Sequence, residues 1–221
     1  MSITYTVLDF PQIGIKGQVF YCPGSYTEGG ITSGGAIVSS FEPGGYGMLD
    51  IAPARRDESV TDPEISWLMS QTNGQIFRVL LTTTPQTLTE RTINDRAVAQ
   101  YPTTLFAKRS LRSTFTDDAL KGSRTVKIDT SEIGPSLKRG HLIGHNNSCY
   151  MVDSVTYETS GEATVIVNPP LRSAIAIDDV VRFTPFFTGQ IINGAEIRAS
   201  YDSANNGAID LPTIRMREVI L

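Results

Sequence analysis

The segment 121–183 constrains the fold most, because it is a series of short apolar runs separated by turn residues. The runs are of strand length and rich in Val, Ile, Thr and Tyr, and Gly, Asn, Ser or Pro bounds each of them. They are 125–128, 140–144, 148–153, 156–157, 161–167 and 178–183. Short strands at this spacing predict a small antiparallel barrel or sandwich.

The same pattern predicts how the whole chain is organised. At 221 residues the chain can hold one large β domain or two smaller ones. We expect 109–183 to be an inserted small β-barrel module, and 1–108 and 184–221 to come together as one separate β domain. The predicted fold class is therefore mainly β, as a sandwich or barrel, with one short helix.

One helix is predicted, at 62–73, between strands at 46–52 and 75–81. Thr61 and Glu64 have the spacing of a capping box, which marks the start of a helix. Trp67 lies beside the apolar stripe of this helix, where core packing is expected. The residues expected on the buried face are Ile65, Leu68 and Met69.

Three further segments outside the predicted barrel indicate secondary structure with different clarity. The Gly-rich segment 12–35 has neither a phosphate-loop spacing nor a dinucleotide fingerprint, so a loop or an irregular hairpin is expected there. The polar tract 82–104 is expected on the surface. The closing segment 213–221 predicts a strand that alternates apolar and basic residues. Ile214, Met216 and Ile220 are expected on one face, and Arg215 and Arg217 on the other.

Composition excludes several classes of protein. The net charge of −4, with acidic and basic residues interspersed, disfavours a nucleic-acid binder. The basic residues near the middle of the chain (Lys108, Arg109 and Arg112) are expected in a solvated linker. No apolar run is long enough for a membrane helix, and the N-terminus lacks a secretory signal, so we expect synthesis in the cytoplasm. Cys22 and Cys149 are then expected to be free thiols.

No motif predicts a catalytic, cofactor or metal site, and no enzyme is expected. His141 and His145 are four residues apart, and with Cys149 they form the strongest candidate for a metal site. They lack the Glu of a metalloprotease motif and lie in a Gly-flanked strand, so ordinary turn and strand roles are favoured. Neither histidine has a serine-nucleophile motif as a partner. The pairs Asp117-Asp118 and Asp178-Asp179 are expected at solvated turns.

Three segments resemble the distal-tail or baseplate minor tail proteins of siphophages. The first is Gly-Gly-Tyr-Gly-Met-Leu-Asp-Ile-Ala-Pro at 44–53, followed by the helix and the strand 75–81. The second includes 136–143, 150–152 and the Val-Asn-Pro-Pro-Leu-Arg segment at 167–172. The third is the closing strand 213–221, after a polar loop. The Gly-rich segment 12–35 departs from the family, and so does His141, which stands where family members carry an acid.

The resemblance implies a tail-tube-like β domain with an inserted OB-like module, and a ring homo-oligomer, expected to be a hexamer. Such a ring would join the tail tube protein to the tail-tip hub or baseplate proteins, with side fibres or receptor-binding proteins as further partners. DNA would only pass through its lumen, there would be no membrane anchor, and the chain would be located in the virion tail tip after assembly in the host cytoplasm.

Two alternatives stay open from the sequence. The chain could be a tail-completion ring protein, or a phage module that binds a cell-surface glycan or receptor. Glycan binding would require an exposed aromatic platform. The aromatic residues available for one are Tyr150, Tyr157, Phe186 and Phe187, for which core or interdomain packing is the favoured interpretation.

Overall fold

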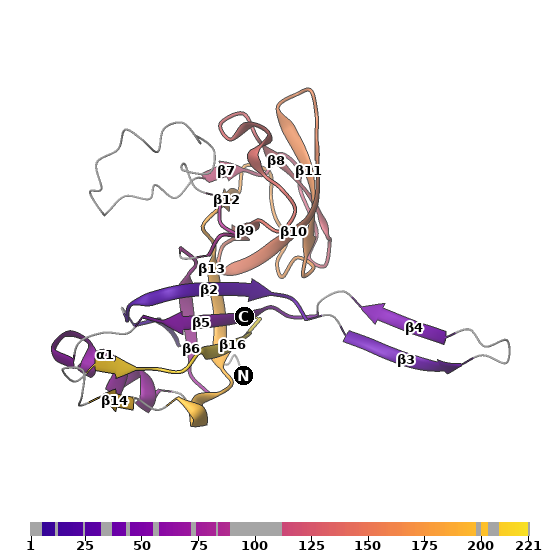
Figure 1. The fold of residues 1–221 in the computed structure, drawn as a ribbon. Coiled ribbons are helices and arrows are strands. Elements are labelled where there is room, and N and C mark those ends of the chain that lie inside the picture. Colours follow the sequence, from indigo (N-terminus) through magenta and orange to yellow (C-terminus); the bar gives the residue numbers. More distant parts are fainter. Residues whose placement is uncertain are drawn as a thin grey trace.

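The computed structural model is mainly β, with two six-stranded sheets, two two-stranded sheets and one α-helix in its described part (Figure 1). This confirms the predicted fold class. The structure describes a set of ranges that together include every strand and helix named below. They are 6–11, 13–23, 25–31, 37–42, 45–54, 58–71, 74–82, 84–88, 112–197, 200–202 and 208–220.

The first six-stranded sheet is built from segments near both ends of the chain. Its strands, in spatial order, are β1 (Val7–Asp9), β6 (Ile76–Leu80), β13 (Phe186–Ile191), β16 (Ile214–Glu218), β5 (Met48–Pro53) and β2 (Ile15–Tyr21). The pair β1–β6 is parallel, and the other neighbours are antiparallel. Sequence analysis predicted β5, β6 and β16 in place, but it missed β2, which lies inside the Gly-rich segment.

Alternation along each strand separates a buried face of this sheet from an outer face. In β16, Ile214 and Met216 are buried whereas Arg215 and Arg217 are exposed, as predicted. The predicted third apolar member, Ile220, lies beyond the strand and is 51% exposed. In β6, Phe77 and Val79 are buried in the core. Side chains alternate because successive residues of a strand point to opposite sides.

The helix α1 (Glu58–Ser70) packs on the core of the first sheet. Ile65 and Leu68 are buried, as predicted, but Met69 is 37% exposed, so its expected place on the buried face is wrong. The helix also begins before Thr61, which lies inside it, so the capping-box start is wrong. Trp67 is 37% exposed and contacts Phe77 edge to face.

The second sheet lies wholly between residues 112 and 182 and curls into a half-barrel. Its strands, in spatial order, are β7 (Arg112–Thr114), β12 (Val180–Arg182), β9 (Leu142–His145), β10 (Ser148–Tyr157), β11 (Glu162–Asn168) and β8 (Thr125–Asp129). Its two edges approach each other at a bridge between Phe115 and Ile128. The predicted segments 148–153 and 156–157 are one strand, β10, because a bulge between Val152 and Ser154 lets it continue.

Two turns of the second sheet use an Asn and a Gly, residue types that tolerate a positive φ. Asn146, at the tip between β9 and β10, has a φ of 53°, and Gly161, between β10 and β11, has a φ of 84°. The sheet encloses a separate apolar core, which includes Phe115, Tyr150 and Phe183. Two buried side chains of this segment, Leu142 and Cys149, instead join the core of the first sheet, so the two units are packed together.

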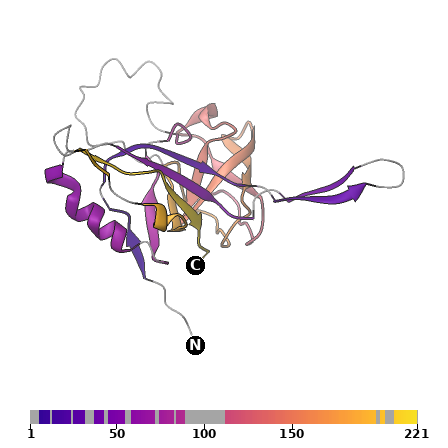
Figure 2. The same ribbon diagram turned by 60° about the horizontal axis from the view of Figure 1, so that its bottom comes forward.

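A β-hairpin extends from the body. It consists of β3 (Ser25–Ile31) and β4 (Ile37–Glu42), which pair with each other and with no other described strand. In Figures 1 and 2 this hairpin projects away from both six-stranded sheets. We call it the arm. It lies in and beyond the Gly-rich segment, for which an irregular hairpin was among the expectations.

The segment that leads from β6 toward the second sheet is partly buried. The predicted surface tract 82–104 is wrong at its beginning, because Thr84, Thr87 and Leu88 are all buried. Leu88 lies in the core of the second sheet. The remainder of the tract from residue 89, together with Lys108 and Arg109, lies outside the described residues.

A single 3-10 turn, Gly194–Glu196, follows β13. The last pair of strands, β14 (Ser200–Asp202) and β15 (Ala208–Asp210), forms a separate two-stranded sheet. Its hairpin precedes β16 and leads the chain back into the first sheet.

Candidate functional site

The three residues weighed as metal ligands lie in different environments. His141 is half-buried, and its Nδ1 accepts a hydrogen bond of 3.1 Å from the backbone N–H of Lys138. Burial, together with the charge of Lys138, lowers the pKa of His141 below its ordinary value. Cys149 is buried in the core of the first sheet, whereas His145 faces Phe115 in the second. Among the described residues, no group of His, Cys, Asp and Glu side chains could hold a metal ion.

The buried His145 takes part in a polar network that sequence analysis missed. Its Nε2 lies 3.1 Å from Oδ2 of Asp179, and its Nδ1 lies 3.4 Å from Oγ of Ser173. The same carboxylate accepts a hydrogen bond from the backbone N–H of Ala176, and the imidazole stacks edge to face on Phe115. The His145 side chain is only 5% exposed, whereas that of Asp179 is 40% exposed. The network anchors the 173–179 loop to the barrel.

The two cysteines are free, as expected, and both lie where the first sheet meets the second. Cys149 is buried, and burial raises the pKa of its thiol well above the ordinary value. Cys22 follows β2, and its Sγ lies 3.6 Å from the backbone oxygen of Asn168 at the end of β11. Burial, with a smaller contribution from Glu218, raises the pKa of Cys22 to about 12. Both thiols therefore stay protonated and unreactive near neutral pH.

A buried ion pair joins the two units. Nε of Arg172 donates to Oε1 of Glu218 at 2.9 Å, and one terminal nitrogen donates to Oε2 at 2.6 Å. The side chains of Arg172 and Glu218 are 13% and 7% exposed. Burial alone would lower the pKa of Arg172, but the hydrogen bonds and the charge of Glu218 outweigh it and raise this pKa. Because the contact is bidentate, it fixes both the separation of the two side chains and their relative orientation.

Backbone contacts also join the two units near the Arg172–Glu218 pair. We call this region, with the ion pair, the interdomain seam. The guanidinium of Arg172 also donates to the backbone oxygen of Gly45, and Glu218 accepts from the backbone N–H of Gly47 at 2.7 Å. At a further contact, Gly144 packs so closely on Pro185 that an added Cβ would come within 2.5 Å of its side chain. Arg172 ends the Pro-Pro-Leu-Arg segment, so the part of the sequence that carries the resemblance also holds the two units together.

Two glutamine side chains act as clamps across the first sheet. The Gln86 amide donates to the backbone oxygen of Phe20 at 2.9 Å and accepts from its N–H at 3.0 Å, so it occupies part of the free edge of β2. Gln18 is 1% exposed; its amide donates to the backbone oxygen of Leu80 and accepts from the N–H of Thr82. Each amide thus makes hydrogen bonds to one backbone N–H and one backbone oxygen, as a neighbouring strand would.

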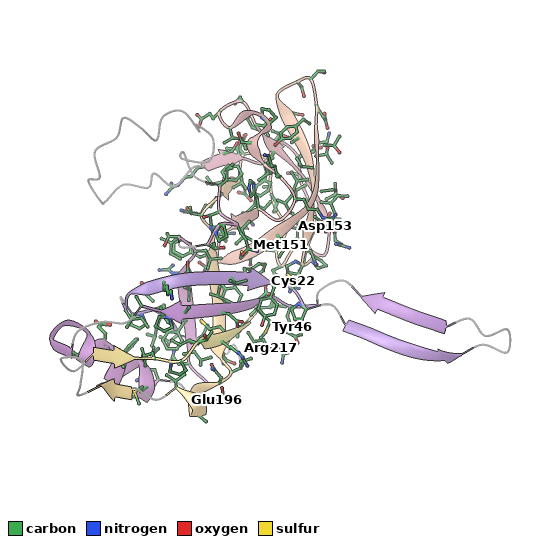
Figure 3. The ribbon with its side chains drawn as sticks, viewed as in Figure 1. Cys22, Tyr46, Met151, Asp153, Glu196 and Arg217 are labelled. Carbon is green, nitrogen blue, oxygen red and sulfur yellow. The ribbon has the colours of Figure 1, made fainter. Side chains whose placement is uncertain are left out.

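The outer face of the first sheet carries arginines stacked on aromatic rings. Direct strand pairing places Arg217 opposite Gln190, and Thr188 opposite Arg78, which puts these residues on one face. The Arg217 guanidinium lies 4.2 Å from the ring centroid of Tyr46 (Figure 3). We call this surface the arginine face; its cationic members are Arg78, Arg215 and Arg217.

The cations of the arginine face differ in how they are paired. Arg78 forms an ion pair of 2.8 Å with Asp9 and lies over the ring of Phe186. Arg215 and Arg217 are both exposed. Within the described residues, neither has a carboxylate oxygen at ion-pair distance. Two adjacent guanidinium groups are therefore available for an anionic partner.

The four aromatic residues considered for a glycan platform lie in different environments. Tyr150 and Phe187 are each 1% exposed, which confirms the favoured interpretation of core packing for these two residues. Phe186 is half-buried, and the guanidinium groups of Arg78 and Arg182 both lie over its ring. Tyr157 donates its hydroxyl to the backbone oxygen of Leu137 at 2.7 Å. All four aromatic side chains therefore make contacts within the protein itself.

Comparison with known proteins adds no family or function. None of the known protein-family models matches the chain, and no curated protein matches its sequence. Within the described residues, no helix combines the length and apolar character needed to cross a bilayer.

Proposed function

We propose that this chain is a ring-forming structural component of a phage tail tip, a distal-tail adaptor that joins the tail tube to the tail-tip hub. The arm carries this proposal. A two-stranded hairpin alone is marginally stable in water, and it becomes stable when a further surface packs against it. Because the arm points away from the body of its own chain, a neighbouring chain is the natural source of that surface (Figure 2).

A ring of identical copies fits this geometry. A projecting element that docks on a different surface of the next copy gives a head-to-tail contact, and such contacts close into a ring when the rotation between copies is suitable. The resemblance to siphophage distal-tail proteins makes six copies the expected number. The tail tube protein and the hub or baseplate proteins would then contact the two sides of the ring.

The interdomain seam supports a structural role. A ring component that transmits contacts between two neighbours needs a fixed angle between its parts. The Arg172–Glu218 pair and the tight packing of Gly144 on Pro185 give the two units such a connection. The glycan-binding alternative is less favoured, because two of its four aromatic candidates, Tyr150 and Phe187, are core residues.

The test is to locate the chain on assembled tailed particles. Gold-labelled antibodies against the purified chain, viewed by electron microscopy, are expected to bind at the end of the tail tube farthest from the head. Labelling at the head-proximal end would favour the tail-completion alternative. Purified particles that contain none of the chain would contradict the proposal.

A further inference from the structure

We propose that the barrel binds a basic amphipathic segment of a partner protein, at the end where segments 117–121 and 174–180 meet. Exposed apolar side chains lie there among carboxylates. We call this surface the barrel patch; its apolar members are Leu120, Ile177 and Val180, and its acidic members are Asp117, Asp118 and Asp178. The inference goes beyond the proposed function, because it concerns binding by a single copy and does not depend on ring formation.

The apolar residues of the barrel patch are unusually exposed. Leu120 is 80% exposed and Ile177 is 57% exposed, which are the two highest values among the large apolar residues that the structure describes. Val180, at the beginning of β12, is 43% exposed. A single exposed apolar residue is ordinary, but several on one surface mark a site of contact with another molecule.

Backbone hydrogen bonds bring the two segments together. Ala119 and Ile175 are directly opposite, and each donates its N–H to the backbone oxygen of the other, at 2.9 and 2.8 Å. Ile175 is buried in the barrel core, and Leu120 follows Ala119, so its side chain points to the other side of the pair, toward solvent. The N–H of Ile177 donates to Oδ1 of Asp118 at 2.8 Å. Exposed residues of both segments therefore form one surface.

Hydrogen bonds also hold this surface in one conformation. In the turn that carries Ile177, the N–H of Asp179 donates to the backbone oxygen of Ala176 at 3.1 Å, and Oδ2 of Asp179 accepts from the N–H of Ala176 at 2.9 Å. The same carboxylate oxygen lies 3.1 Å from Nε2 of the buried His145. A surface that is ordered before binding loses little conformational entropy when a partner docks. The His145 network therefore positions the exposed residues of this turn.

The charge of the barrel patch is negative. Its two segments contain four aspartates and one lysine. Asp118 and Asp178 are exposed, and neither forms an ion pair within the described residues; Asp117 pairs with Lys127 at 3.5 Å. These carboxylates are not arranged for a metal ion, because no group of ligating side chains in the described ranges could hold one. Cationic side chains of a partner are therefore the expected counter-charge.

The combination of apolar and acidic groups indicates the chemistry of the partner. Apolar side chains of the partner would cover Leu120 and Ile177, and lysines or arginines beside them would face Asp118 and Asp178. Protein interfaces commonly have such an apolar centre with a polar rim. A lipid surface is a poorer match, because anionic head groups repel carboxylates. We therefore expect a protein segment with apolar residues on one side and basic residues at its border.

The experiment measures the binding of a model segment to the full-length chain. The probe is a fluorescent amphipathic peptide of Leu and Lys, followed by fluorescence anisotropy, and a Leu and Glu peptide of the same pattern is its counterpart. The Leu and Lys peptide is expected to bind at least about tenfold more tightly, because like charges face each other in the complex with the counterpart. Raising the salt concentration should reduce this difference.

Two double substitutions test the two parts of the surface. L120S/I177S removes the exposed apolar area, and the affinity for the Leu and Lys peptide is expected to fall about tenfold or more. D118N/D178N removes two charges but keeps an acceptor for the N–H of Ile177. This variant should bind the peptide with a much smaller dependence on salt.

A matched control and a footprint locate the site. V19S/I192S changes two apolar residues that are 55% and 52% exposed outside the barrel, and it should bind like the unmodified chain. Hydrogen exchange of the unmodified chain, measured by mass spectrometry with and without the peptide, is expected to slow at 117–121 and 174–180. This footprint does not depend on how the variants fold, and circular dichroism checks the fold of each variant.

The outcomes separate this inference from the proposed function. Loss of peptide binding in L120S/I177S, with the footprint on the barrel patch, supports the inference even if the chain stays single, a result that overturns only the proposed function. Equal binding of both peptides, unchanged binding in L120S/I177S or a footprint elsewhere overturns the inference. Binding to phosphatidylglycerol vesicles that L120S/I177S abolishes also overturns it, because the occupant is then a lipid. Loss of rings in L120S/I177S does the same, because the patch then joins copies of the chain.

Discussion

The barrel and the first sheet differ in how fully each satisfies its own backbone and apolar surface. The barrel takes all its strands from one continuous segment, and its edges approach each other at Phe115 and Ile128. The first sheet is built from strands near both ends of the chain, and its two edge strands, β1 and β2, each have a strand neighbour on one side only. The arm projects from it. A sheet that closes on itself leaves few sites for pairing, whereas an open one must be protected or used. Assembly is therefore expected to depend on the first sheet.

The largest expected effect tests whether the two units are separate in stability. Phe77 is completely buried in the core of the first sheet, so F77A is expected to lower the free energy of unfolding by about 3–5 kcal/mol. Hydrogen exchange measured by mass spectrometry should rise in β5, β6 and β16 while β8 and β11 stay protected. Equal loss of protection in both sheets would show that they form one cooperative unit.

A second prediction concerns the link between the two units. E218Q leaves the buried guanidinium of Arg172 without its counter-charge, and the expected loss is about 3 kcal/mol of unfolding free energy in urea. D153N, which removes a carboxylate paired with the more exposed Arg124, should cost less than about 1 kcal/mol. Similar losses in the two variants would mean that the seam contributes no more than a surface contact.

The clamp on β2 gives a smaller effect. Q86A removes two hydrogen bonds to the backbone of Phe20, for an expected loss of about 1–2 kcal/mol. Exposing this edge should also increase aggregation, followed by light scattering at rising concentration. Q75A, which removes one exposed hydrogen bond to Thr6, serves as the control. Unchanged light scattering in Q86A would indicate that the edge is protected by other means.

The smallest effect is a pH dependence at the boundary of the two units. The folded-state pKa of Cys22 is raised to about 12, so the unfolded thiol loses its proton first as pH rises. The stabilisation is complete below the unfolded pKa near 9 and declines above it. Between about pH 8 and 10 the chain should lose about 1 kcal/mol more stability than C22S. Parallel pH profiles for the two proteins would place Cys22 in contact with solvent.

Sequence predicted the barrel better than the first sheet for a physical reason. Short-range signals decide the barrel: Asn146 and Gly161 mark its turns, and alternation marks its strands. Local signals failed where tertiary contacts decide. The capping-box spacing at Thr61 placed the helix start too late, and the glycines around β2 concealed a strand that is held by pairing with β5.

The candidate surfaces were even less accessible to sequence reasoning. Arg215 and Arg217 were predicted on an outer face, but their lack of ion pairs depends on which carboxylates the fold brings near. Arg172 and Glu218 are 46 residues apart and in different units, so no local pattern joins them. The network of His145 with Ser173 and Asp179 likewise depends on a loop that folds back across the barrel.

The most direct test of self-association is the mass of the full-length chain in solution. It is measured by native mass spectrometry across a range of concentrations. We predict a discrete species of six copies whose population falls as salt is raised, because exposed charges hold the contact. A single-copy mass at all concentrations, with the arm cleaved as readily by protease as an unfolded segment, would contradict the account.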